Sequence, residues 1–91
     1  MKISFDPAKR VATLQNRGLD MLRAGEAISG VNVTIEDCRR DYGETRFITI
    51  AFLDHRMVVI VWTSRGENCR VISMRKANDR EQALYGPRFG L

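Results

Sequence analysis

The chain of 91 residues has room for one domain whose core can fold unaided, but it is too short to enclose a deep cofactor cleft. Fifteen Lys and Arg against eleven Asp and Glu leave a net charge of +4, and twelve of the fifteen cations are Arg. Because a guanidinium group matches the shape of phosphate and carboxylate, this bias favours an anionic partner, although Arg-rich codon usage explains the ratio equally well.

The N-terminal segment predicts a short strand followed by a helix. Lys2–Phe5 has strand character, Asp6 can cap a helix, and Pro7 suits the first helical position. We expect the helix to run over Pro7–Arg17 and to end at Gly18, where a glycine can adopt a left-handed backbone.

A second, shorter helix and a weak strand follow. Asp20 can cap this helix, and Gly25 is expected to stop it early. Gly30 then opens a strand over Val31–Ile35, whose alternation of apolar and polar residues predicts one solvated face. The charged residues Glu36–Gly43 predict a loop.

Three longer strands dominate the second half. They are expected over Thr45–Leu53, Met57–Arg65 and Cys69–Arg75, and the segments Asp54–Arg56 and Gly66–Asn68 connect them as hairpins. The first two strands are almost continuously apolar, which indicates burial on both faces in the middle of an antiparallel sheet.

The C-terminal segment predicts a last helix. Asn78–Glu81 is a variant capping box, and the helix should end near Gly86 and Pro87. The predicted fold is therefore one α+β domain over 1–91. An antiparallel meander of three to four strands carries the N-terminal helices, and a helix closes the chain.

The sequence shows no metal-ligand pattern. Cys38 and Cys69 lack metal spacing and His55 is the only histidine, so we expect no structural zinc and no other metal or cofactor. Cys38 is interpreted as a loop thiol and Cys69 as a packing residue. The longest apolar run, Met57–Trp62, is too short for a membrane span. Without a signal peptide, a cytoplasmic location is the simplest expectation.

Four arginines lie on three neighbouring predicted strands: Arg46, Arg65, Arg70 and Arg75. A cation near a sheet core needs an anion to offset its desolvation, so these side chains favour a phosphate site, and the phosphate of a nucleic acid fits a basic chain of this size. Arg70 and Arg75 are five residues apart and would point to opposite faces of a regular strand. The alternative is a set of surface salt bridges with Glu44, Glu67 and Glu81.

Guanidinium groups stay protonated, so these arginines would hold a scissile phosphate and stabilise the charge that develops on it as a ribose 2′-hydroxyl attacks. Arg46 and Arg65 are the first catalytic candidates and Arg75 the next, and Arg70 is expected to be an RNA contact. Glu44 is the best candidate for the general base, and it is equally the best partner for a purely structural Arg46. Ser73 and Lys76 can add phosphate contacts. Trp62 can stack a base, but its apolar neighbours favour the core.

Motifs spread over nearly the whole chain resemble the BrnT family of type II toxin–antitoxin ribonucleases, which has a RelE-like fold. The motifs are Phe5-Asp6-Pro7 with Lys9, Gly18-Leu19-Asp20, Gly43-Glu44-x-Arg46-Phe47, Trp62-Thr63-x-Arg65-Gly66, Arg70-x-Ile72-Ser73-x-Arg75-x-Ala77 and Glu81. Three positions depart from the family pattern. Thr13 stands where the family has Asn, Arg17 where it has His, and Met74 where it has a small residue.

The resemblance implies a metal-independent endoribonuclease toxin that inhibits translation and growth. It also implies neutralisation by a BrnA-like ribbon-helix-helix antitoxin, contact with operator DNA through that antitoxin, and a hetero-oligomer. Candidate antitoxin interfaces are the first helix, the strand around Val33 and the tail Pro87–Leu91.

Two other hypotheses are kept. Loss of the family His at Arg17 fits a catalytically lapsed interaction or co-repressor module. A sequence-independent nucleic-acid binder is the third hypothesis.

Overall fold

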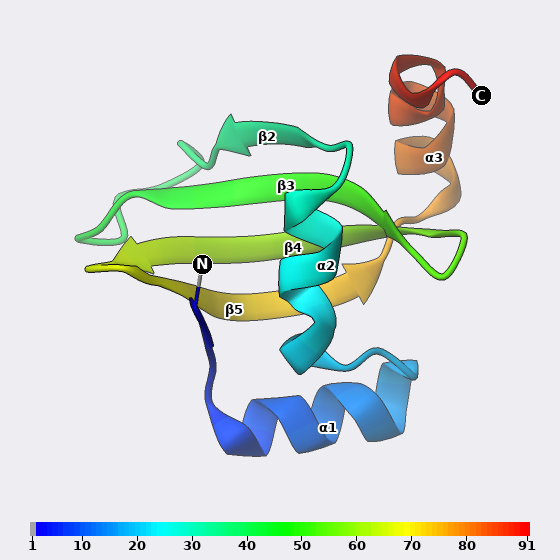
Figure 1. Cartoon of the computed structure of the whole chain (residues 1–91). Coiled ribbons are helices and arrows are strands. Elements are labelled where there is room, and N and C mark those ends of the chain that lie inside the picture. The colour runs from blue at the N-terminus through cyan, green and yellow to red at the C-terminus, as the bar shows by residue number, and fades with distance from the viewer. Residues whose placement is uncertain (1) are drawn as a thin grey trace.

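The computed structural model describes residues 2–91 as a five-stranded sheet with helical segments against both faces (Figure 1). In chain order the elements are β1 (Lys2–Ser4), α1 (Pro7–Arg17), the 3₁₀ turn η1 (Met21–Arg23), α2 (Ala24–Ser29), β2 (Val33–Glu36), β3 (Arg46–Leu53), β4 (Arg56–Arg65), β5 (Asn68–Lys76), α3 (Asp79–Tyr85) and the 3₁₀ turn η2 (Gly86–Phe89). The predicted α+β class is confirmed. None of these helices is long and apolar enough to cross a membrane.

The sheet is larger than predicted and is mixed rather than antiparallel. Its strand order is β1-β5-β4-β3-β2, and β1 runs parallel to β5 at one edge. The expected meander of three to four antiparallel strands describes β2 to β5 correctly but misses this pairing. A three-residue strand contains no sequence signal for a partner 66 residues later (Lys2 pairs with Asn68), because its register depends on tertiary packing.

Helix α1 forms as predicted. The Asp6 side chain accepts a hydrogen bond from the Ala8 amide at 2.9 Å, and Pro7 occupies the first helical position. Gly18 ends the helix in the left-handed region with a φ of 67°, and its amide donates to the Leu14 carbonyl.

The prediction that Gly25 stops the second helix is wrong. Helix α2 continues through Gly25 to Ser29. A Cβ placed at Gly25 would lie 3.2 Å from Ile3 Cγ1, so the glycine allows the helix to approach β1 closely. Burial of Ala24 and Ala27 against the sheet stabilises the helix despite the low helix propensity of glycine.

One face of the sheet, here called the helix face, packs against η1 and α2. Its core joins Leu19, Met21, Ala24 and Ala27 of the helical segment to apolar residues of the three central strands: Ala51, Leu53, Val58, Ile60, Val71 and Met74. Trp62 packs against this core, and its indole nitrogen donates to Thr49 Oγ1 at 2.8 Å. The interpretation of Trp62 as a core residue is therefore confirmed.

The opposite face is covered only in part. Tyr85 of α3 and Phe89 of η2 pack over Ile50, Met57 and Val59 at one end of the sheet. The Asn78 side chain and Glu81 form the predicted capping box at the start of α3. Because α3 and η2 are short, the other end of this face remains without a covering helix in the described residues, and the loop between β2 and β3 borders it (Figure 1).

Candidate functional site

The four predicted arginines lie on the same face of the sheet. Arg46 pairs with Thr63, which pairs with Arg70, so these residues form one cross-strand row. Arg65 is two residues beyond Thr63 on β4 and has the same orientation. Arg75 pairs with Val59, which pairs with Ile50, and Ile50 is four residues from Arg46 on β3. We call this surface the arginine face.

A β-bulge explains why Arg70 and Arg75 share a face. Val61 pairs with Ser73 whereas the next residue, Trp62, pairs with Val71, so Ile72 is an extra residue in β5. The sequence argument that these two arginines point to opposite faces assumed a regular strand and is wrong. A bulge inserts one residue and restores the common orientation. The two rows of arginines are roughly 13 Å apart along the strands, at about 3.3 Å per residue.

Glu44 joins two of the arginines at one end of the face. Its Oε2 lies 3.2 Å from Arg46 Nε and its Oε1 lies 3.4 Å from an Arg65 nitrogen. The Glu44 carboxylate is 27% exposed, so it is accessible from solvent although it is ion-paired. This geometry suits both roles that the sequence left open, a general base and a partner that orients Arg46.

The loop between β2 and β3 adds an aromatic ring and another arginine. The Arg46 guanidinium lies 4.1 Å from the centre of the Tyr42 ring, and the Tyr42 hydroxyl donates to Asp37 at 3.1 Å. The buried Asp37 accepts two hydrogen bonds from the Arg39 guanidinium, at 2.7 and 2.8 Å. These contacts, led by the Arg39 hydrogen bond, hold the pKa of Asp37 well below its ordinary value.

Arg75 lies at the other end of the arginine face and forms a bidentate ion pair with Glu81 of α3. Its two terminal nitrogens lie 2.7 and 2.8 Å from the Glu81 oxygens. Hydrogen bonding from Arg75 lowers the pKa of Glu81 to about 2. The same hydrogen bonds raise the pKa of Arg75, and the charge of nearby Arg39 opposes this rise. Arg39 and Arg75 are therefore neighbouring cations.

A cavity of about 230 Å³ lies between these two arginines. Its apolar lining comes from β2, β3 and β4, and its polar lining comes from Arg39, Ser73, Arg75, Glu81 and Tyr85. Tyr85 packs on the sheet and also borders this cavity. Arg39 and Tyr42 were missed because they lie in a charged loop, where only the three-dimensional structure indicates which side chains return to the sheet.

Arg70 differs from the other three arginines in its contacts. Arg46, Arg65 and Arg75 each form a salt bridge with a glutamate, whereas within residues 2–91 Arg70 has none. Its side chain is half-buried and lies across from Thr63. Arg70 is therefore the arginine of this face that a phosphate can approach without displacing a carboxylate.

The other predicted contact residues are divided between two places. Ser73 borders the cavity beside Arg75. Lys76 instead lines a different hollow, next to Met57 and Gln82 near the C-terminus. The structure thus brings Ser73 to the arginine face and does not bring Lys76 there.

The two departures from the family pattern on α1 lie together against the bulge of β5. Thr13 is buried, and Arg17 donates to the Met74 carbonyl at 2.9 Å. With Lys9 they line a second cavity of about 230 Å³ that also reaches Ile72 and Ser73. Ser73 therefore borders both cavities, and Arg17 contacts the backbone of the residue that precedes Arg75.

The cysteines and titratable side chains show no metal-like cluster. Cys38 is exposed and Cys69 is buried, as interpreted from sequence, and both are free thiols. Burial raises the pKa of Cys69 to about 11, so its thiol stays protonated at neutral pH. Among the described residues, no three His, Cys, Asp or Glu side chains gather in a way that would hold a metal ion.

Comparison with known proteins supplies the family. No curated protein matches the chain. A family model described as the ribonuclease toxin BrnT of type II toxin–antitoxin systems matches residues 5–81, which include α1, all the long strands, the bulge and the arginine face. This chain therefore belongs to the BrnT family of ribonuclease toxins.

Proposed function

We propose that the chain is a metal-independent endoribonuclease toxin and that the arginine face holds the RNA backbone during cleavage. The observation that carries this proposal is the β-bulge at Ile72, because it adds Arg75 to the face that already holds Arg46, Arg65 and Arg70. Four guanidinium groups on one partly uncovered sheet face form a surface suited to phosphates. We propose that the fold is RelE-like, as the resemblance of the sequence motifs implies.

In the proposed reaction, the ribose 2′-hydroxyl attacks the adjacent phosphate, and the bond to the 5′-oxygen breaks. Arg70 and Arg46 would bind the non-bridging oxygens and stabilise the negative charge that grows on them in the transition state. The protein needs no metal for this step, since fixed guanidinium groups supply the positive charge. The products would carry a 2′,3′-cyclic phosphate and a 5′-hydroxyl.

Glu44 is the proposed general base. It lies in the loop just before β3, and it is held by Arg46 and Arg65, so it is oriented towards the groups that would bind the phosphate. Glu81 is less suited to this role, because its low pKa and bidentate contact with Arg75 make it a poor proton acceptor. Ser73 would donate a hydrogen bond to phosphate beside Arg75. In this proposal Lys76 is not an RNA contact.

The partner follows from the family. A type II toxin has a protein antitoxin, and we propose that it is of the BrnA kind, with a ribbon-helix-helix part that carries the hetero-oligomer to operator DNA. The proposed place of action is the cytoplasm, where cleavage of RNA would stop translation and growth.

The alternative function is a catalytically lapsed interaction module. The observation that favours it is the position of Arg17, which replaces a family histidine and bonds to the backbone of β5 instead of remaining free to transfer a proton. An intact arginine face with no turnover would support this alternative.

Substitution of Arg70 tests the site directly. Arg70→Lys keeps the charge but loses the forked donors, so single-turnover cleavage of RNA should fall by roughly 10²-fold while RNA affinity changes little. Arg70 has no salt bridge among the described residues, so the change should not destabilise the fold. Arg80→Lys, on the exposed surface of α3, is the matched control and should retain full activity. Equal cleavage by both variants would refute the assignment of Arg70.

A further inference from the structure

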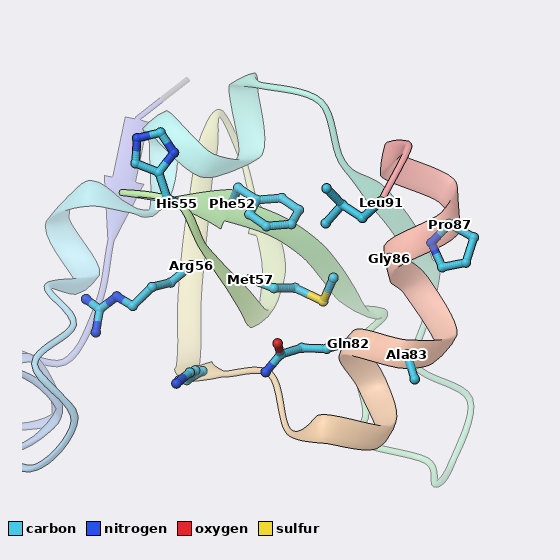
Figure 2. Close-up of a pocket in the computed structure, with 10 residues that line it drawn as sticks. Phe52, His55, Arg56, Met57, Gln82, Ala83, Gly86, Pro87 and Leu91 are labelled. Carbon is cyan, nitrogen blue, oxygen red and sulfur yellow. The ribbon is translucent and has the colours of Figure 1, made fainter.

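A second surface lies at the C-terminal end of the molecule, beyond the Arg75 end of the arginine face. A cavity of about 560 Å³ opens between the β3–β4 hairpin and the C-terminal turns. Figure 2 shows Phe52, Met57, Gln82 and Leu91 around this cavity, with Pro87 on its far side. The proposed cleavage does not use it.

A neighbouring cavity of about 500 Å³ extends the first one. The two share the lining residues Phe52, His55 and Leu91, and we call these two adjoining cavities together the C-terminal groove. The second cavity adds Val31 and Phe89. Phe89 packs edge-on against Phe52, with ring centres 5.0 Å apart, so these two rings form one wall of the groove.

The groove contains the most exposed large apolar side chains of the described residues. Val31 is 78% exposed and Leu91 is 77% exposed, and both line the second cavity. Exposed apolar side chains that gather at one cavity are typical of a surface that binds another protein. In an isolated domain, apolar side chains that remain exposed do not contribute to the apolar burial that stabilises the fold.

The charges of the groove indicate the character of the partner. Its charged or titratable side chains are His55, Arg56 and Lys76, and no acidic side chain lines either cavity. The nearby Asp54 is occupied by Arg23, which binds its two carboxylate oxygens. An apolar floor with a basic rim complements a segment that carries apolar anchors between acidic residues.

We propose that the C-terminal groove is the docking site for an acidic, amphipathic segment of the antitoxin. This inference rests on the proposed toxin function. One apolar side chain of that segment would fill the cavity over Phe52 and Met57, another would contact Val31 and Leu91, and its carboxylates would lie beside Arg56 and Lys76. The groove lies at the opposite end of the chain's last strand from Arg70, so docking and RNA binding use different side chains.

The test measures binding of the purified cognate antitoxin to variants of the groove. Val31→Asp and Leu91→Asp are substitutions of exposed side chains, and each should weaken binding by about tenfold or more, because it removes an apolar contact and repels an acidic segment. Val11→Asp changes a side chain of α1 that is 54% exposed and should bind normally. Arg56→Glu should weaken binding and reduce its salt dependence.

The outcomes separate docking from cleavage. RNA cleavage by the free variants is measured in parallel, and the groove variants should cleave like the unsubstituted protein. Normal antitoxin binding by Val31→Asp and Leu91→Asp would overturn the proposed docking site, whatever the cleavage assay shows. Weaker binding by Val11→Asp alone would place the interface on α1. If the free toxin dimerises and Leu91→Asp abolishes the dimer, the groove binds a second copy of this chain. That result would also overturn the proposal.

Discussion

At the scale of single residues, three of the arginines on the arginine face already have carboxylate partners. Arg46 and Arg65 share Glu44, and Arg75 is bound by Glu81. Salt bridges on an exposed surface contribute little to stability, so we propose that these glutamates act mainly by orienting guanidinium groups for a phosphate.

Glu44→Gln separates the two roles of this residue. Arg46 and Arg65 donate to different oxygens of Glu44. Glutamine keeps one acceptor oxygen, so it can still hold one of these arginines, but it cannot take a proton from the 2′-hydroxyl. If Glu44 is the general base, kcat should fall by about 10²-fold or more, and the acidic limb of the pH–rate profile should disappear. A change of only a few-fold with an unaltered pH profile would leave Glu44 as an orienting residue.

At the scale of secondary structure elements, the bulge in β5 shows where sequence reasoning stops. The sequence predicted where two helices begin, after the capping residues Asp6 and Asn78, and it also predicted the hairpin strands. Both predictions were possible because capping residues and apolar runs are local signals. Nothing local to Ile72 indicates an extra residue. The common orientation of Arg70 and Arg75, and the pairing of β1 with β5, depend on register and could not be predicted.

The candidate site residues also divide into those that the sequence indicates and those whose placement depends on three-dimensional contacts. The predicted arginines, Glu44 and Ser73 were found through residue type and motif, and the structure groups them on or beside one face. Arg39 and Tyr42 reach that face from a loop, and this placement depends on contacts with Asp37 that no sequence spacing reveals. Lys76, predicted from sequence as an RNA contact, lies elsewhere and lines the cavity near the C-terminus.

The attachment of α3 to the sheet should depend on pH through Glu81. Its pKa in the folded protein is about 2, below the ordinary value of 4.5, so its ion pair with Arg75 stabilises the fold above about pH 4.5. This stabilisation is lost as the pH falls from about 4.5 towards 2. Glu81→Gln keeps the capping box but removes the charge.

Because Arg75 is 42% exposed, the effect of Glu81→Gln should be modest, at most about 1 kcal/mol at neutral pH, or a melting temperature lower by about 4 °C. Thermal unfolding followed by circular dichroism at pH 7 and at pH 2 measures it. The difference between the variant and the unsubstituted protein should shrink at pH 2. An equal difference in melting temperature at pH 7 and at pH 2 would show that the ion pair does not cause this difference.

At the scale of the whole molecule, we propose that one surface binds the substrate and the other binds the partner. The arginine face has the chemistry for RNA, and the C-terminal groove has apolar and basic side chains for an antitoxin segment. Induction of the chain alone should stop growth of a host cell, and co-expression of the cognate antitoxin should restore growth and yield a complex that copurifies. A harmless chain that recovers as a free monomer in the presence of the antitoxin would contradict this division.

The most direct test of the central claim is cleavage of a defined RNA by the purified chain in excess EDTA, with analysis of the product ends. The arginine face predicts cleavage at an unchanged rate, with 2′,3′-cyclic phosphate and 5′-hydroxyl ends, because guanidinium groups supply the charge that a metal would otherwise provide. Arg70→Lys in the same buffer should lose this activity by roughly 10²-fold. Cleavage that stops in EDTA and returns with added Mg²⁺ would contradict the metal-independent mechanism.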